Sequence, residues 1–426
     1  MNKFIEKAKI VFRDPIIRKR IGFTVGALFV FRLLASIPIP GIDAVALQHF
    51  LSGNQVFGLF DVFSGGGLSH LSIVMLGVSP YITASIIMQL LTMMSPNLKA
   101  TFHEEGERGR MKLAQYSRLL AVPLALISAV GFLKLLQGQA VLGNLSGMTL
   151  FTNVVVITGG SLLLMWIGEL ISEFGIGNGV SLIIFAGIVA ALPAKIPQFF
   201  AQFEQSQIPT DVFLLALAFL AVLGVVFFSE AERPVPVTYA KQVRGMKTYG
   251  GSSTYLPLRL NQAGVIPIIF ALSILVFPQV IAGYVAAHAH GATIVSIATT
   301  VAAYLATTTW THNILYFLLV FVFTYFYTAV TFDPVAIAEN LQKGGAFISG
   351  IRPGESTSDY LGKVVTRITL VGALFLAVVA VLPFIIQTAT NTGTTLAIGG
   401  TALLIVVSVV LDLLKKVDAQ VSMREY

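Results

Sequence analysis

The chain has 426 residues, of which 56% are hydrophobic and only 11% are charged; its mean hydropathy is +0.84 and its formal net charge is +7. Because soluble domains are about a quarter charged, this composition excludes a soluble globular protein and a disordered one, and it predicts an integral membrane protein. Cysteine is absent, which excludes disulfides, thiolate metal sites and cysteine nucleophiles.

Ten hydrophobic segments are each long enough to cross a hydrocarbon core of roughly 30 Å as a helix. The runs are continuous, which favours helices over the alternating strands of a barrel. In chain order the segments are residues 21–38, 72–95, 116–136, 151–171, 179–200, 211–229, 261–285, 313–332, 367–387 and 396–414.

The lysines and arginines indicate the orientation. If ten spans alternate, all but three of the 27 basic residues fall on one side of the membrane, the exceptions being Arg32, Lys134 and Lys195. The positive-inside rule therefore predicts that both termini are cytoplasmic.

Two inward loops are long, at residues 230–260 and 333–366, and both are charged and contain Gly and Pro. Long basic cytoplasmic loops suggest a docking face for a cytosolic partner. The alternative is that they only satisfy the positive-inside rule, and composition alone does not separate the two.

The outward segment 57–71, FGLFDVFSGGGLSHL, is apolar, too short to cross, and interrupted by Gly65, Gly66 and Gly67. Such a segment beside a span is a candidate re-entrant element, which survives at membrane depth only where protein or a water-filled cavity surrounds it. The alternative is an interfacial loop on the outer surface.

A short sequence motif is repeated in the second and seventh segments. Gly77-Val78-Ser79-Pro80 opens one and Gly264-Val265-Ile266-Pro267 lies in the other, at similar places in successive five-span halves. Paired Gly/Pro interruptions are typical of inverted-repeat membrane proteins with a site between the halves.

The sequence contains no motif typical of catalysis and few of the buried charged residues that ion-coupled transport requires. No phosphate-binding loop G-x-x-x-x-G-K-[ST] occurs, and residues 175–179 read as a tight turn. Arg32 is the one clear intramembrane charge. Three acidic residues lie near span ends: Glu169, Glu173 and Asp412. The six histidines lie in loops or at span edges and are expected to be solvated: His49, His70, His103, His288, His290 and His312. A path without titratable groups fits a passive conduit better than an ion-coupled carrier.

Motifs spread over the whole chain resemble one family closely: SecY, the large subunit of the bacterial protein-conducting channel. They include FRLLASIPIPGID (31–43), LGVSPYITASIIMQLL (76–91), GIGNGVSLIIFAGIVA (175–190), LPLRLNQAGVIPIIFA (256–271) and NLQKGGAFISGIRPGEST (340–357). The resemblance implies an all-α membrane protein in which ten transmembrane helices form two pseudo-symmetric halves, residues 1–200 and 201–426. These would surround an hourglass pore closed by a short re-entrant plug helix.

By this resemblance, three sets of residues take positions in the channel. The pore ring falls on Val78, Ile82, Ile184, Ile269 and Ile405. The plug, about residues 57–71, includes Phe60, Phe63, Ser64, Gly65, Gly66, Gly67 and Leu68. The lateral gate, between the second and seventh spans, includes Pro80, Ile86, Gln89, Pro267 and Ile274. A ring of branched apolar side chains holds no ion and dewets when it is narrow, and the two prolines are expected to permit helix kinks.

The resemblance also implies a docking role for Lys241, Arg244, Lys247 and Arg352 in the long loops. A guanidinium can form two parallel hydrogen bonds with a carboxylate or phosphate of a partner. The implied partners are the small subunits SecE and SecG, the motor ATPase SecA, the ribosome, signal-bearing polypeptides and the lipid bilayer, with SecDF and YidC as accessory factors.

The expected function is a passive protein-conducting channel in a bacterial plasma membrane. Unfolded precursors would cross through the pore and membrane-protein helices would leave sideways, driven by SecA, the ribosome or the proton-motive force. No enzyme activity, metal or cofactor is expected. The rivals are a secondary solute transporter, which would need a polar site and buried carboxylates at mid-membrane, and an intramembrane enzyme, which would need paired catalytic residues within spans.

Overall fold

The computed structural model describes residues 13–40, 64–68, 71–95, 98, 107–138, 142, 146–201, 208–239, 242–244, 247–249, 253–288, 291–306, 309–390 and 399–422. The fold is mostly helical. Each of the ten predicted segments coincides with one helix: α2 (Pro15–Ala35), α5 (Ser79–Met94), α7 (Glu107–Gly138), α8 (Gly147–Phe174), α9 (Gly179–Ala201), α10 (Ile208–Glu230), α11 (Ile266–His288), α13 (Trp310–Thr331), α15 (Glu355–Thr390) and α16 (Gly399–Ser422).

Within these described residues, four stretches are long and apolar enough to cross a membrane by length and composition. They are Met111–Lys134, Gly147–Phe174, Trp310–Lys343 and Glu355–Ile386. Shorter apolar helices accompany them, among them α12 (Ala292–Tyr304), which lies between α11 and α13 and was not predicted.

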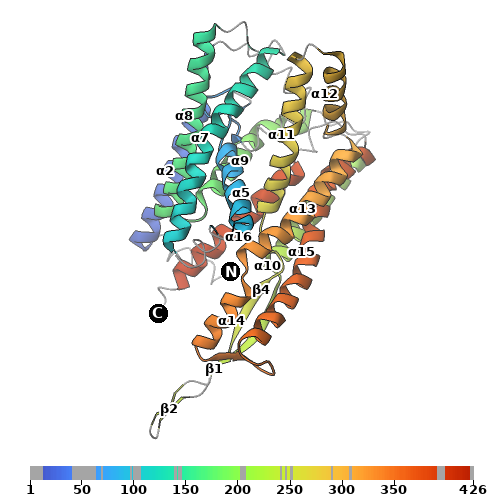
Figure 1. Cartoon of the computed structure of the whole chain (residues 1–426). Coiled ribbons are helices and arrows are strands. Elements are labelled where there is room, and N and C mark those ends of the chain that lie inside the picture. The colour runs from blue at the N-terminus through green and yellow to red at the C-terminus, as the bar shows by residue number, and fades with distance from the viewer. Residues whose placement is uncertain are drawn as a thin grey trace.

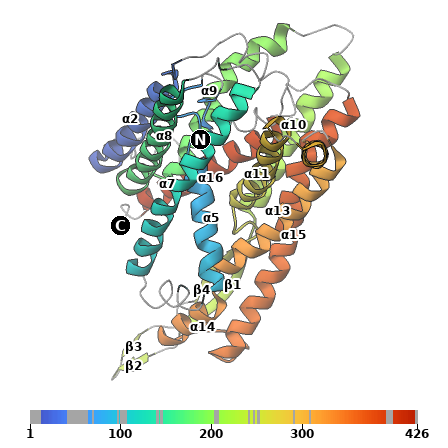
Figure 2. The same ribbon diagram turned by 45° about the horizontal axis from the view of Figure 1, so that its top comes forward.

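The helices form two groups that meet along the middle of the molecule (Figure 1). One group holds α2, α7 and α8, and the other holds α10, α11, α13 and α15 (Figure 2). Helix α16 joins them, because it packs against α10 and α15 and also against α9, while α11 contacts both α5 and α7.

The two long loops are not irregular, and here the expectation of an all-α protein is wrong. β1 (Glu232–Tyr239) pairs antiparallel with β4 (Ser253–Arg259) from the same loop and with β5 (Ala346–Ile348) from the other, in the order β4-β1-β5. A separate pair is formed by β2 (Gln242–Arg244) and β3 (Lys247–Tyr249). Pro234 and Pro236 fit in β1 because β5 pairs only with its last three residues, which leaves the first part of that side unpaired.

A small apolar core holds this sheet against α15 and the short helix α14 (Pro334–Lys343). Val235 and Val237 of β1 alternate with exposed neighbours and face Ile348 and Leu361. Because both loops contribute to one sheet and one core, they form a single unit at one end of the bundle (Figure 1).

Helix starts differ from the predicted ones in an informative way. Segment 72–95 becomes a helix only at Ser79, and segment 261–285 only at Ile266. Gly77 and Gly264 precede these starts with φ of 57° and 62°, values that favour glycine. Pro80 and Pro267 therefore occupy the first turn, where a missing N–H costs no helix hydrogen bond. The prediction that they kink their helices is wrong, and the Gly-Val-x-Pro motif is a repeated helix start.

Glycines set the closest approaches between backbones. A Cβ on Gly160 of α8 would overlap the carbonyl of Ile73, and one on Gly179 of α9 would overlap the carbonyl of Gly168. The neighbouring Gly159 faces open space. Small residues at helix interfaces are what allow such packing in membranes.

We predict that Gly160→Ala lowers stability by about 1–3 kcal/mol, the usual cost of overpacking, because the Ile73 backbone must move. The matched control Gly159→Ala is expected to be neutral or slightly stabilising, since Ala favours a helix over Gly by about 1 kcal/mol. Thermal unfolding of the purified protein in detergent measures both. Equal melting temperatures for the two variants would contradict the assigned contact.

Candidate functional site: an apolar centre, a plug segment and a gate

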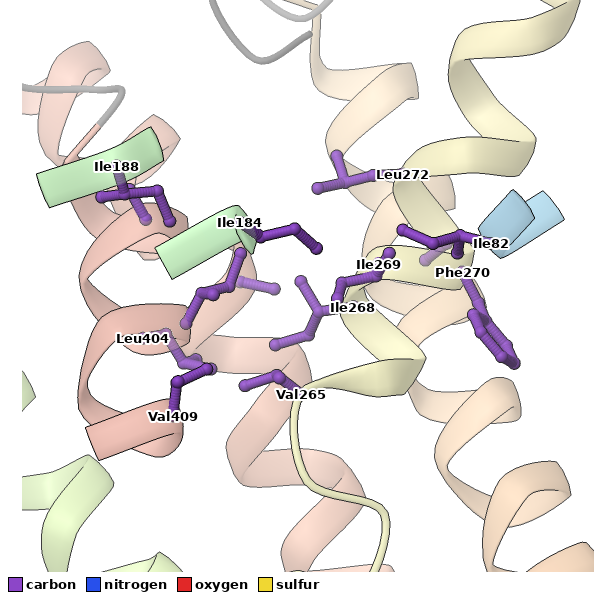
Figure 3. Packing of buried hydrophobic residues seen from close by; sticks show 14 of the residues in the cluster. Ile82, Ile184, Ile188, Val265, Ile268, Ile269, Phe270, Leu272, Leu404 and Val409 are labelled. Carbon is purple, nitrogen blue, oxygen red and sulfur yellow. The ribbon is translucent and has the colours of Figure 1, made fainter. Parts of the chain in front are cut away.

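The five predicted pore-ring residues come from four helices and meet in one buried cluster. Val78 caps α5 and Ile82 follows in its first turn, while the other three lie on α9, α11 and α16. None is more than 9% exposed: Val78 0%, Ile82 9%, Ile184 1%, Ile269 6% and Ile405 1%. Figure 3 shows Ile184 and Leu404 on one side of the cluster and Ile268 and Ile269 on the other. Branched apolar side chains thus fill the centre of the molecule.

A cavity of mixed polar and apolar lining adjoins this cluster on the side of the sheet. Its volume is about 240 Å³. Val265 and Val409 belong to both the cavity wall and the apolar cluster. The rest of the wall mixes apolar residues, among them Leu182, Ile266 and Leu413, with polar and charged ones, among them Asn178, Asn261, Gln262, Ser408, Arg259, Asp412, Lys415 and Lys416. A cavity with polar and charged groups in its wall therefore adjoins the apolar cluster.

The plug segment is described only in part: Phe60 and Phe63 lie outside the described residues, and Ser64, Gly65, Gly66, Gly67 and Leu68 lie within them. Gly65 and Gly66 have φ of 73° and 80°. The Ser64 hydroxyl accepts a hydrogen bond from the Leu68 N–H at 3.0 Å, and Ser64 and Leu68 are each 2% exposed. The glycine triplet is thus a tight buried turn and not a loop on the surface.

Gly65 explains why the triplet needs glycine. A Cβ there would overlap the ring of Phe31 on α2, and a Cβ on Gly187 of α9 would overlap Gly65 itself. The turn is clamped between two helices at backbone contact. Nothing in the sequence pattern pairs Gly65 with Gly187, because they are far apart in the chain.

Arg32 lies beside the same turn. Its Nη1 donates to the Gly65 carbonyl at 3.4 Å. Arg32 thus bonds to the segment that the sequence predicts as the plug. Residues 37–39 also pair with 71–73, through Ile39 N–H to Leu71 O and Ile73 N–H to Ile37 O, both at 2.9 Å.

The predicted gate residues divide between buried and exposed positions. Pro80, Ile86 and Pro267 are buried, Gln89 is half-buried, and Ile274 is 39% exposed. The Gln89 Oε1 is buried without a hydrogen-bond partner. Helices α5 and α11 touch, and α7 and α13 flank them, so these residues lie along one seam.

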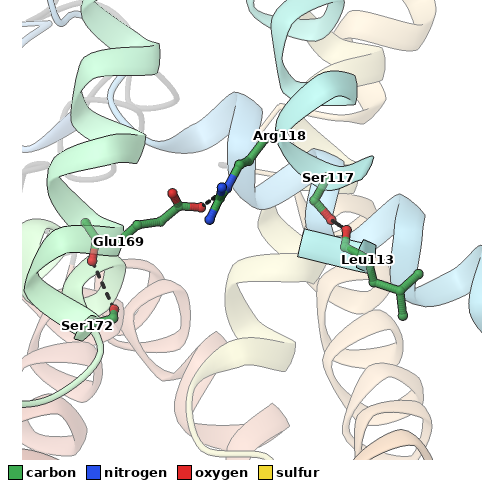
Figure 4. A network of polar contacts seen from close by, with 6 residues as sticks. Leu113, Ser117, Arg118, Glu169 and Ser172 are labelled. Carbon is green, nitrogen blue, oxygen red and sulfur yellow. Dashed lines mark hydrogen bonds and ion pairs between the residues drawn. The ribbon is translucent and has the colours of Figure 1, made fainter. Parts of the chain in front are cut away.

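One ion pair between helices was missed. Helix α7 begins at Glu107 instead of residue 116, so Arg118 lies about 16 Å from the start of that helix. Arg118 Nε donates to Glu169 Oε1 of α8 at 2.6 Å (Figure 4). Glu169 also bonds with Tyr81 of α5. The pair therefore ties the gate helix α5 to α7 and α8.

The prediction that the histidines are solvated is wrong for His312. His312 is 3% exposed in the first turn of α13, and its Nδ1–H donates to the Leu305 carbonyl at 2.8 Å. His49, His70, His103 and His290 lie outside the described residues. In the part of the chain that the structure describes, no group of three His, Asp or Glu side chains could hold a metal ion.

The four residues predicted to bind a docking partner lie in different structural environments. Lys241 lies outside the described residues, while Arg244 and Lys247 face each other in the β2–β3 pair. Arg352 is exposed in a tight loop between Gly350 and Gly354, whose φ values are 85° and 98°. Its carbonyl accepts the hydroxyl of buried Thr357 at 2.8 Å. This loop thus holds Arg352 at an exposed position near the sheet.

Solved structures share this arrangement. One described as "The structure of a protein conducting channel" matches with a TM-score of 0.67 at 19% identity, covering 96% of this chain and 93% of that one. Another, "Sec61 in the Canine ribosome-channel complex from the endoplasmic reticulum", matches with a TM-score of 0.64 at 18% identity over the same shares. These likenesses show that the fold is that of protein-conducting channels.

Sequence comparison identifies the family. The SecY family model matches residues 72–414. "Protein translocase subunit SecY" of Escherichia coli K12 is 43% identical, covering 96% of this chain and 93% of that protein, and the subunit of the same name from Corynebacterium glutamicum is 41% identical over 97% of each. The chain belongs to the SecY family of protein translocase subunits.

We predict that Arg118 and Glu169 are energetically coupled. A double-mutant cycle with Arg118→Gln and Glu169→Gln should give a coupling of about 0.6 kcal/mol, the average for polar pairs between membrane helices. Thermal unfolding in detergent at low and high salt measures it.

The exposed Lys343–Glu339 pair of α14 is the control, at 3.2 Å with side chains 74% and 57% exposed. Its coupling should be about 0.3–0.5 kcal/mol and should fall with salt. Loss of the Arg118–Glu169 coupling at the same salt concentration would contradict the assignment of that pair to a shielded site.

Proposed function

We propose that the chain is the central subunit of a passive protein-conducting channel in a bacterial plasma membrane. All ten helices span the membrane, both termini are cytoplasmic, and the sheet lies on the cytoplasmic side. Residues 1–200 and 201–426 form the two halves of an inverted repeat. The repeated Gly-Val-x-Pro helix starts support that symmetry.

The apolar centre is the observation that carries this proposal. A ring formed by Val78, Ile82, Ile184, Ile269 and Ile405 offers no ligand to an ion and no hydrogen bond to water. An extended polypeptide can push such side chains aside without any sequence being preferred. The cavity below the ring would receive the unfolded chain, and its polar residues, among them Asn178, Asn261 and Gln262, could bind backbone amides that need hydrogen-bond partners until they enter the constriction.

The seam between α5 and α11 is proposed as the lateral gate. A signal sequence is itself an apolar helix, and its transfer from the pore to lipid is driven by removal of apolar surface from water. Opening requires α5 to leave α11. The Arg118–Glu169 pair and the Tyr81 contact would make α5 move together with α7 and α8.

Energy must come from outside the chain. The motor ATPase SecA, the ribosome and the proton-motive force are the proposed sources, with SecE and SecG as companion subunits and SecDF and YidC as accessory factors. The sheet of the two long loops supports docking, because it holds Arg352 exposed on a firm base.

The direct test uses proteoliposomes that contain this chain with SecE and SecG. SecA, ATP and a signal-bearing precursor are added outside, and protease-protected precursor is counted. Protection is expected to require ATP and to fall at least about tenfold in Arg352→Glu, since losing one charge-assisted contact of 1.5–3 kcal/mol reduces binding by about that factor. Lys363→Glu, an exposed neighbour on α15, is the charge-matched control and should remain active.

Equal activity of Arg352→Glu and wild type would keep the channel but remove Arg352 from docking. No protection with wild type, while an established translocase is active in the same assay, would overturn the channel proposal.

The plug segment gives an independent prediction. Gly187→Ala should displace Gly65 from its place between α2 and α9, so vesicles that contain this variant should leak small ions faster than wild type. Iodide influx measured by a trapped fluorescent indicator reports the leak. Gly159→Ala, which meets no neighbour, should leave it unchanged. A tight seal in correctly folded Gly187→Ala would show that this turn does not close the pore.

A further inference from the structure

Helix α12 exposes an apolar stripe in the part of the chain that the structure describes. Ile294, Ile297, Val301 and Tyr304 recur at helical spacing along one face, and they are 55%, 61%, 39% and 61% exposed. The only buried side chain of the helix is Ala298. Helix α12 packs beside α11, at the end of the bundle away from the sheet (Figure 1).

The surrounding sequence carries no charge. No Asp, Glu, Lys or Arg occurs from Leu260 to Phe332, a stretch that includes α11, α12, α13 and both of their connections. A connection that runs through water between two spans has no reason to exclude all four residue types. A lipid environment does, because a charge in the hydrocarbon core is expensive.

The free backbone groups at the two ends of α12 differ in their hydrogen-bond partners. At its C-terminal end the hydroxyls of Thr309 and Thr311 donate to the Tyr304 carbonyl at 2.9 and 2.6 Å, and His312 Nδ1–H donates to the Leu305 carbonyl at 2.8 Å. These carbonyls would otherwise need water. At the N-terminal end the N-cap is Gly291, which has no side chain that could accept a hydrogen bond from the first N–H groups.

Two exposed hydroxyls of α12 are also satisfied internally. Thr299 Oγ1 donates to the Val295 carbonyl at 2.9 Å, and Thr300 Oγ1 donates to the Ser296 carbonyl at 2.7 Å. A helix in lipid must satisfy its polar groups in this way, because no water is present to do so.

We propose that α12 is a half-helix inserted into the bilayer leaflet opposite the sheet, with its open N-terminal end at the headgroups and its capped C-terminal end among acyl chains. Its occupant is lipid: the stripe Ile294–Tyr304 contacts acyl chains directly. At about 20 Å, thirteen residues are too short to cross a core of roughly 30 Å but long enough to pass through one leaflet. This inference rests on the membrane class of the chain and not on the channel activity.

The test uses single nitroxide labels, which the absence of native cysteine makes possible. Ala292→Cys reports the open end of α12, Val301→Cys the capped end, and Leu318→Cys, exposed on α13, serves as the lipid-facing reference. The full chain is reconstituted in vesicles of phosphatidylethanolamine and phosphatidylglycerol. Spin relaxation is then measured with oxygen, which concentrates in hydrocarbon, and with a water-soluble nickel chelate.

The ratio of oxygen to nickel accessibility at Val301→Cys is expected to be severalfold higher than at Ala292→Cys and close to that at Leu318→Cys. A nickel accessibility at Val301→Cys equal to that at Ala292→Cys would place the helix in water and overturn the proposal. Shielding of Val301→Cys from both reagents would also overturn it, because a protein and not lipid would then cover the stripe.

Discussion

A backbone N–H or carbonyl inside a bilayer has no water to bind, and this constraint governs the whole structure. Residues 71–78 run as turns at the entrance of α5 and are buried almost throughout. Their polar groups therefore need protein partners: Ile37 and Leu71 accept hydrogen bonds in the short ladder between residues 37–39 and 71–73, and the Gly77 carbonyl accepts the hydroxyl of Ser161 on α8. Irregular backbone survives here because α2 and α8 surround it.

Close backbone approach follows from the same constraint. Irregular backbone can be enclosed only if neighbours come near, and the glycines at 65, 160 and 187 permit that. The consequence for function is mechanical. The turn at residues 64–68 is held by close contact with α2 and α9 and by a hydrogen bond from Arg32, so its position depends on these two helices.

The two ends of the molecule have different physical characters. The sheet end is charged, and there the two long loops share one hydrophobic core that fixes Arg352 in place. The opposite end carries the uncharged α11–α12–α13 region. Between them lies the apolar cluster, which offers nothing to ions, and a cavity lined partly by polar and charged residues meets it from the sheet side. A conduit that moves polypeptides needs this order, because unfolded chain must be solvated before it is desolvated.

The sequence by itself determined the membrane class, the positions of ten apolar segments and the family, because hydropathy and motif order are properties of single stretches of chain. It also indicated the plug glycines and the paired Gly-Val-x-Pro motifs. Tertiary structure decided the rest: that Pro80 and Pro267 start helices, that Arg118 finds Glu169, that His312 is buried, and that Gly65 rests on Gly187. Each of these depends on contacts or helix limits set by residues elsewhere in the fold, and no local pattern encodes which distant backbone or side chain will be the partner.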